Sequence, residues 1–209
     1  MKLYNANLSP NCLRVRAVAS ELDAALEVVD IEPFRAGPDR ERLLAINANG
    51  KVPVLDDDGF VLWESRAITR YLASLHGNKL YPIDAKTRAT IDQWSFWQAI
   101  HLGPAMQALV FENVLKAKFG MGEPDPAVVK SKLAETVRYL AVLEQALEGT
   151  WIAGEISLAD FALASTFMLR EPAGISLSST PRVAAWIERV EALESWQIAV
   201  KPLLPLFEG

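Results

Sequence analysis

The sequence predicts an α/β domain followed by an all-helical domain. Strand and helix signals alternate over the first third of the chain, and this region contains an Asp-Gly pair between two apolar runs. After a stretch with Gly, Asn and Pro at residues 77–82, only helical patterns follow. Since a chain of 209 residues has room for two modest domains, we expect the α/β domain at residues 1–77 and the helical domain at residues 84–209.

The first half of the α/β domain is predicted as strand, helix, strand. Lys2–Asn5 forms a short first strand. Ser9 and Pro10 indicate a helix start, because serine caps free backbone amides and proline suits the first turn. Leu26–Asp30, with two adjacent valines, predicts the second strand. A strand-helix-strand unit of this kind gives a parallel strand pair with a right-handed crossover.

The second half of this domain is predicted to close with a hairpin. Arg40–Ile46 fits a short helix. Val52–Leu55 and Phe60–Trp63 are apolar runs, and the Asp-Gly pair between them is a strong hairpin signal. Ser65 then opens a helix with apolar residues on one face. The order βαβαββα predicts a mixed sheet with helices packed on it.

Helical patterns fill the predicted second domain. Residues 84–118 form a long helical stretch, which Gly103 and Pro104 should kink or divide. Ser157 and Asp160 resemble a capping box in front of an apolar run. Further helices are predicted over residues 133–147, from residue 157 onward and over residues 181–191.

The composition points to a cytoplasmic protein without nucleic-acid or membrane partners. The net charge of −5 argues against a general nucleic-acid binder. Cys12 is the single cysteine, so the fold needs no disulfide. No signal-peptide core and no apolar run of about 18 residues is present. With only His76 and His101, a metal site or a Ser-His hydrolase is hard to build, and we expect no metal.

Lys51, Val52 and Pro53 form the most informative segment. Proline cannot donate to a sheet ladder, so it belongs at a sheet edge or a strand start. Two interpretations stay open. One is an edge strand with a trans proline. The other is a cis-Pro53 that turns the Val52 backbone outward, so that a thiol peptide can pair with it like an added strand.

Two serines stand at predicted helix starts. Ser65 directly follows a strand and Glu64. A helix N-terminus offers free N–H groups and partial positive charge, which suits a carboxylate. The simplest interpretation is that Ser65 is a cap and Glu64 a dipole partner. Ser9 is likewise either a cap or a hydroxyl donor to an anion.

Together these segments resemble the cytosolic glutathione transferases. The N-terminal features are Ser9 followed five residues later by Arg14-Val15, then Asn47-x-x-Gly50-Lys51-Val52-Pro53, the Asp-Gly hairpin, and Glu64-Ser65-Arg66-Ala67-Ile68. In the second domain, Trp151–Gly154 followed by Ser157–Phe161 looks like the family's C-terminal capping motif. The resemblance covers nearly the whole chain. It implies a thioredoxin-like N-terminal domain, an all-α C-terminal domain and a homodimer.

The resemblance implies glutathione as co-substrate and assigns the residues that hold it. Ser65 and its amide would hold the γ-glutamyl carboxylate, and Glu64 would face the γ-glutamyl ammonium group. The backbone of Val52, next to the proline, would pair with the cysteinyl part. Lys51 and Arg40 would meet the glycyl carboxylate by charge.

The implied catalytic residue is Ser9, as in the phi and zeta classes. Its hydroxyl would donate to the glutathione sulfur, and the helix dipole would add to this, so that the thiolate is favoured over the thiol. One charge-assisted hydrogen bond of ~1.5–3 kcal/mol lowers a thiol pKa by about one to two units. The thiolate would then attack an electrophilic carbon. Asn11 is an alternative donor, and Cys12 could instead form a mixed disulfide, as in thiol-transferring classes.

The implied reaction is conjugation of glutathione to small hydrophobic electrophiles, a detoxification chemistry, in a pocket of the second domain. Taken singly, each candidate lining residue fits a core or dimer-interface position better than a pocket lining; they are Trp97, Met106, Leu109 and Phe111. Asp92 is a candidate acid from the partner subunit to complete Glu64. Two other functions stay open: a non-catalytic interaction protein with the same fold, and a glutathione-dependent isomerase or thiol transferase.

Overall fold

The computed structural model of the chain describes residues 1–33 and 35–206, which form two compact units. The first unit runs from Met1 to Ile83 and includes the C-terminal segment that begins at Ala192, and the second is Asp84–Glu191. The division after Ile83 follows the predicted linker. The C-terminal segment groups with the first unit because its helix, α10 (Glu194–Val200), packs along α1 (Pro10–Glu21). The compact units therefore differ at the C-terminus from the domain ranges 1–77 and 84–209.

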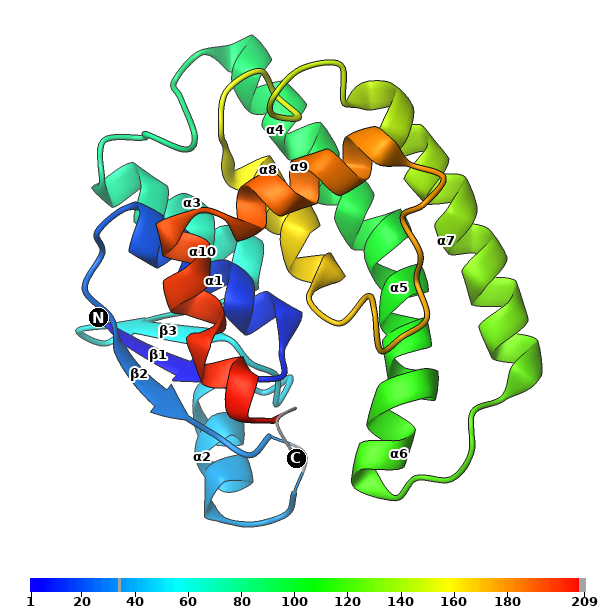
Figure 1. The fold of residues 1–209 in the computed structure, drawn as a ribbon. Coiled ribbons are helices and arrows are strands. Elements are labelled where there is room, and N and C mark those ends of the chain that lie inside the picture. The colour runs from blue at the N-terminus through cyan, green and yellow to red at the C-terminus, as the bar shows by residue number, and fades with distance from the viewer. Residues whose placement is uncertain (34, 207–209) are drawn as a thin grey trace. The chain divides into compact units, whose positions relative to one another are not determined.

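The first unit contains a four-stranded mixed sheet in the order β2-β1-β3-β4 (Figure 1). β1 (Lys2–Asn5) pairs in parallel with β2 (Glu27–Asp30) and antiparallel with β3 (Val54–Asp57). β3 and β4 (Phe60–Trp63) form the predicted hairpin, whose turn residues Asp58 and Gly59 both have positive φ. β3 starts two residues later than predicted, because Pro53 has no N–H for the ladder.

The sheet packs helices on both faces. Tyr4 and Val54 lie opposite each other on neighbouring strands and share a core cluster with Leu43 of α2 (Pro38–Ile46). Leu3 and Leu55 are the next pair along the same strands, so they point to the opposite face. That face is covered by α1 and α3 (Ser65–Leu75), which contact each other. The predicted mixed sheet with packed helices is confirmed.

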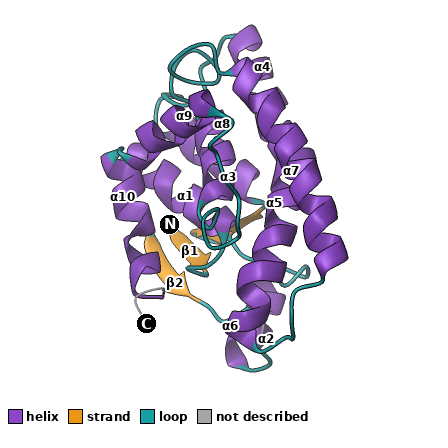
Figure 2. Cartoon of the chain, turned by 45° about the vertical axis from the view of Figure 1, so that its right-hand side comes forward, coloured by secondary structure: helices purple, strands orange, loops and turns teal. Residues whose placement is uncertain are grey.

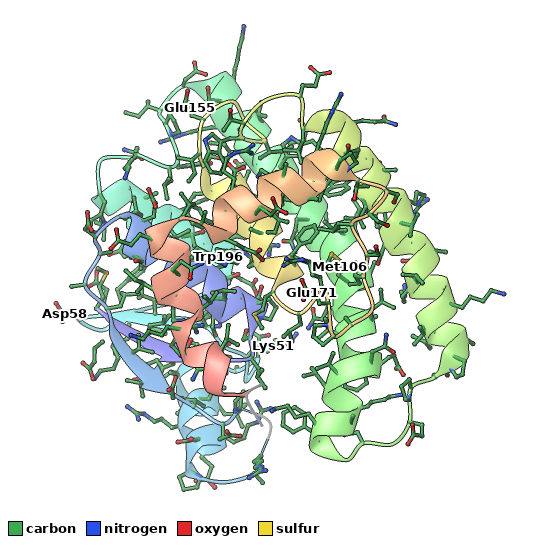
Figure 3. All side chains as sticks on the ribbon, in the orientation of Figure 1. Lys51, Asp58, Met106, Glu155, Glu171 and Trp196 are labelled. Carbon is green, nitrogen blue, oxygen red and sulfur yellow. The ribbon has the colours of Figure 1, made fainter. Side chains whose placement is uncertain are left out.

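α10 and the following 3₁₀ segment η4 (Lys201–Leu206) were not predicted from the sequence. A seven-residue helix covers only two turns and leaves little periodic signal. α10 buries Trp196, which Figure 3 labels, and its Ser195 hydroxyl donates to Glu21 Oε2 at the end of α1 (2.7 Å).

The second unit is helical, as Figure 2 shows by its purple coils. Its first helical stretch is continuous through segments that change type along the way; they are α4 (Ala85–Trp97), the π-helical turn η1 (Gln98–Leu102), α5 (Gly103–Val110), the π-helical turn η2 (Phe111–Leu115) and α6 (Lys116–Phe119). Gly103 and Pro104 therefore do not divide the helix. The wide π turn ends directly before them and accommodates the proline, which has no N–H.

The remaining helices of this unit lie where helices were predicted, although α7 begins seven residues before the predicted range 133–147. They are α7 (Pro126–Ala146), α8 (Leu158–Ala164) with the short 3₁₀ turn η3 (Ser165–Phe167), and α9 (Pro181–Glu191). Ser157 caps α8, and Asp160 completes the predicted capping box. Across the described residues, no helix is both long and apolar enough to cross a membrane.

Candidate functional site

Three of the predicted site segments lie at one end of the sheet, where β1 and β4 end and β3 begins. Val54, the first residue of β3, pairs with Tyr4 near the end of β1 and with Trp63 at the end of β4. Ser9 follows β1, Pro53 precedes β3, and Ser65 follows β4. Strand pairing alone therefore brings Ser9, the Pro53 segment and the helix start at Ser65 to the same end of the sheet.

Ser9 is the N-cap residue of α1. Its Oγ accepts a hydrogen bond from the backbone N–H of Cys12 at 3.3 Å, so the capping interpretation is correct. An oxygen that accepts this bond still carries its own O–H donor. Asn11 lies in the first turn of α1, and its Oδ1 accepts from Arg14 Nη1 at 2.8 Å. Both predicted catalytic candidates thus stand at the positive end of one helix.

Cys12 is buried behind this helix start. The backbone N–H of Ala6 donates to its Sγ at 3.4 Å, and the side chain has no exposed surface. Burial raises the pKa of the Cys12 thiol, although the Ala6 amide and Ser9 act in the opposite direction. A buried neutral thiol is a poor partner for a mixed disulfide. Within residues 1–33 and 35–206, no three His, Cys, Asp or Glu side chains gather as metal ligands would.

The N-terminus of α3 is built differently from that of α1. Glu64 is the N-cap residue, with a positive φ of 74°, and its side chain does not cap the helix. Ser65 is buried and does not act as the cap either. Its Oγ accepts from Arg14 Nη1 at 2.6 Å and lies 3.4 Å from Asn11 Oδ1. The first-turn amides of α3 are therefore not capped by Glu64, as suits an anion site.

Arg14 is a site residue that the sequence reasoning missed as a functional group. Its buried guanidinium joins Asn11 on α1 to Ser65 on α3. Burial first, and the nearby Arg66 charge second, lower the pKa of the Arg14 guanidinium. The available signal was that Arg14 stands between two apolar residues, Leu13 and Val15, of a predicted helix. Its partners could not be read from spacing.

The loop after α2 folds back onto Arg40 of that helix next to Lys51, the other predicted cation. Arg40 Nη1 donates to the carbonyl oxygen of Gly50, and Lys51 is the next residue and exposed. The Asn47 side chain fixes the loop by donating to the Lys51 carbonyl oxygen at 2.8 Å and accepting from the Asn49 N–H at 3.1 Å. Figure 3 labels Lys51 at this position.

The Val52–Pro53 peptide is cis, so the proline isomer of the second interpretation is confirmed, whereas pairing of a thiol peptide with Val52 stays a prediction. The Val52 side chain packs against the core cluster of Tyr4 and Val54. In the described part of the chain, no hydrogen bond involves the Val52 backbone N–H or C=O. The backbone of this residue is thus available to an added strand.

The predicted pocket residues belong to the second unit. Met106, labelled in Figure 3, and Leu109 are buried on α5, which packs against α7. Trp97 packs edge-on against Tyr139 at 5.9 Å between ring centroids, and Phe111 is exposed. Their role as a substrate lining stays a prediction.

Comparison with known proteins identifies the family. Residues 1–74 match the family model of the glutathione S-transferase N-terminal domain, and residues 102–194 match that of the C-terminal domain. The chain is 34% identical to glutathione S-transferase 3 of Zea mays, over 98% of this chain and 96% of that protein. The chain belongs to the glutathione S-transferase family.

Solved structures of other glutathione S-transferases agree with the fold. Maize glutathione S-transferase I, in complex with an atrazine glutathione conjugate, superimposes with a TM-score of 0.87 at 28% identity over 98% of each chain. A theta class enzyme of Xanthomonas axonopodis pv. citri, with glutathione bound, gives a TM-score of 0.86 at 27% identity over 96% of each chain. This glutathione S-transferase therefore has the predicted thioredoxin-like domain followed by a helical domain.

Proposed function

We propose that this protein conjugates glutathione to small hydrophobic electrophiles, with Ser9 activating the glutathione thiol. The observation that carries the proposal is the meeting of two helix N-termini, those of α1 and α3, beside the unpaired Val52 backbone. Its relatives are named glutathione S-transferases, and the Xanthomonas structure holds glutathione, which supports the same co-substrate here.

The γ-glutamyl end of glutathione would bind at the start of α3. The amide and hydroxyl of Ser65 face the carboxylate in this proposal, and the helix dipole adds partial positive charge. The buried Arg14 behind Ser65 orients the hydroxyl and reinforces the positive potential. Glu64, exposed beside it, would face the ammonium group.

The rest of the tripeptide would run along the proline segment. The cysteinyl part pairs with the Val52 backbone N–H and C=O as an added strand would. The glycyl carboxylate then reaches Lys51 of the loop after α2 and Arg40 of α2, which bonds to that loop, where charge-assisted hydrogen bonds are available.

This placement brings the thiol to the start of α1. The Ser9 hydroxyl donates to the sulfur and favours the thiolate, and the dipole of α1 acts in the same direction. The Asn11 side-chain amide is a second candidate donor. The thiolate forms a C–S bond to the electrophilic carbon, and the leaving group departs with the electron pair of the bond that breaks. The proposed lining of the electrophile pocket stays within the second unit and consists of Trp97, Met106, Leu109 and Phe111.

We further propose a cytoplasmic homodimer that serves detoxification. β4 is an edge strand with three exposed large apolar side chains, Phe60, Val61 and Trp63. Apolar edges of this kind need cover in a soluble protein, and a second copy of the chain supplies it. Asp92 is the candidate acid that the partner subunit would add near Glu64.

Ser9→Ala tests the mechanism, with Ser20→Ala at the other end of α1 as the matched control. We expect glutathione binding, measured by calorimetry, to survive in both variants. Loss of one bond of ~1.5–3 kcal/mol to the thiolate should lower turnover of a chloronitrobenzene about 10- to 150-fold in Ser9→Ala alone. Unchanged turnover in Ser9→Ala would assign thiol activation to Asn11 in place of Ser9. A wild type that does not bind glutathione would overturn the enzyme function in favour of the interaction protein.

A further inference from the structure

A buried arginine other than Arg14, Arg16 in the middle of α1, connects this helix to the C-terminal helix. Arg16 Nε and Nη2 both donate to the carbonyl oxygen of Ala199, at 3.2 and 3.1 Å. Arg16 Nη1 donates to Asn5 Oδ1. One guanidinium thus holds the last turn of α10 and the last residue of β1 at the same time.

Asn5 connects Arg16 to the loop that precedes Ser9. Its Nδ2 donates to Asp30 Oδ1 at 2.6 Å and to Asn7 Oδ1 at 2.9 Å. Asn7 in turn donates to Asp30 Oδ2 at 3.5 Å. The loop Ala6–Leu8 closes onto the helix through Ser9 N–H, which donates to the Ala6 carbonyl oxygen at 3.0 Å. Among the described residues, the polar contacts of this loop are therefore anchored on the pair Asn5 and Asp30 or on the start of α1.

The charges along this chain of contacts are complementary. The buried Arg16 cation has Asp30 as its nearby anion, reached through the Asn5 amide, and a carbonyl at the C-terminal end of α10 on its other side. Carbonyl groups at a helix C-terminus carry partial negative charge and favour a cation. A buried cation without these partners is costly, so the network holds its geometry as a unit.

We propose that Arg16 is a positioning residue for thiol activation: through Asn5 it fixes the loop that sets the position of Ser9, and through Ala199 it makes that position depend on α10. The proposal rests on the proposed role of Ser9. It assigns to the C-terminal segment an effect on the reacting thiol that is separate from any contact with the electrophile.

The test measures two properties of the glutathione complex, the affinity by calorimetry and the thiol pKa by the ultraviolet absorbance of the thiolate. Arg16→Met should raise the thiol pKa by about half a unit to one unit, and so lower kcat/KM below that pKa about three- to tenfold. The affinity for glutathione should change much less. Arg16→Lys, which keeps a donor and the charge, should recover part of the loss.

Arg170→Met is the control for a lost arginine, because Arg170 pairs with Glu191 inside the second unit. It should lower the melting temperature without moving the thiol pKa. If Arg16→Met behaves like Arg170→Met, Arg16 is merely structural and the proposal is overturned. In a Ser9→Ala background, Arg16→Met should have no further effect on the thiol. If Ser9→Ala itself leaves the thiol pKa unchanged, the proposed role of Ser9 fails, and that failure is recognised before any Arg16 variant is considered.

Asp30→Ala supplies a second variant that does not remove a buried cation, since Asp30 is exposed at the end of β2. It removes one of the two acceptors of Asn5 and the acceptor of Asn7, and it should shift the thiol pKa in the same direction as Arg16→Met, by less. Glu27→Ala, at the exposed start of the same strand, is its matched control. Equal thiol pKa values in these two variants would overturn the proposal even if Arg16→Met did not fold.

Discussion

Arg14 Nη1 lies 2.6 Å from Ser65 Oγ, so one buried guanidinium joins the N-termini of α1 and α3. The same nitrogen donates to Asn11 Oδ1. In the proposed complex, the glutathione carboxylate would lie at Ser65 and the glutathione sulfur at Ser9. These residues stand at the N-termini of two helices that the Arg14 side chain joins. A change at Ser65 therefore affects both the binding of glutathione and the stability of the first unit.

Ser65→Ala should weaken glutathione binding and destabilise the protein. A lost charge-assisted bond of ~1.5–3 kcal/mol corresponds to about a 10- to 150-fold rise in the dissociation constant. Arg14 also loses a buried acceptor, which costs about 1–3 kcal/mol of stability. Calorimetry and denaturant unfolding measure the two effects. Ser74→Ala on the same helix, where the hydroxyl is exposed, should show neither. Unchanged affinity in Ser65→Ala would remove Ser65 from the glutathione site.

Gly50→Ala should disturb the proposed contact with the glycyl carboxylate. Gly50 has a φ of 58°, and a Cβ there would overlap the Arg40 guanidinium. The strained backbone costs about 1–2 kcal/mol, and the displaced Arg40 should weaken glutathione binding. Gly59→Ala is the control, because Gly59 also has a positive φ but a Cβ there meets no atom within 4 Å. If both variants bind glutathione equally well, Arg40 has no part in binding.

The local features of this fold were readable from the sequence. Ser9 and Pro10 at a helix start, the Asp-Gly turn and the Ser157 capping box act over a few residues, and each was predicted where the structure has it. The cis peptide before Pro53 was one of two interpretations, because a sequence pattern does not decide the isomer.

The parts that could not be predicted depend on contacts between distant residues. Arg14 and Ser65 are 51 residues apart, and Arg16 and Ala199 are 183 apart. Asp160 makes both kinds of contact. Its capping bonds with the nearby Ser157 were predicted, whereas the bond it accepts from the distant Trp186 Nε1 at 3.0 Å was not. The spacing of polar residues along a helix does not indicate which distant residues they will bond to. These hydrogen-bond partners are therefore identified only in the folded chain.

The proposed homodimer predicts that a charge on β4 will separate the subunits. Phe60→Lys places a cation opposite Asp57 in the hairpin, which the fold should tolerate because cross-strand opposite charges attract. Sedimentation velocity should show a dimer for wild type and a shift toward monomer for Phe60→Lys. Ile198→Lys, at an exposed apolar residue of α10, should stay dimeric. A monomeric wild type, or equal dimerisation of both variants, would contradict cover of β4 by a second copy.

Glu112 should make the second unit sensitive to acid. Its Oε2 accepts from Lys116 Nζ at 2.6 Å and from the Asp125 backbone N–H at 2.7 Å, which ties the segment before α7 to η2. The Lys116 bond first, and the Asp125 amide second, lower the pKa of Glu112 from its usual value of 4.5. The folded state therefore binds this proton more weakly than the unfolded state. The stabilisation is fully present above the usual value and is lost as the pH falls through the lowered one.

The measurement is the melting temperature of wild type and Glu112→Gln between about pH 3 and pH 7. Above the usual glutamate value, the variant should melt clearly lower, because an amide cannot replace the ion pair with Lys116. The difference should shrink toward acid, where wild type loses the same charge. Glu148→Gln, an exposed residue just after α7, should follow wild type at every pH. A constant difference between wild type and Glu112→Gln across the whole range would show that Glu112 acts through packing and not through its charge.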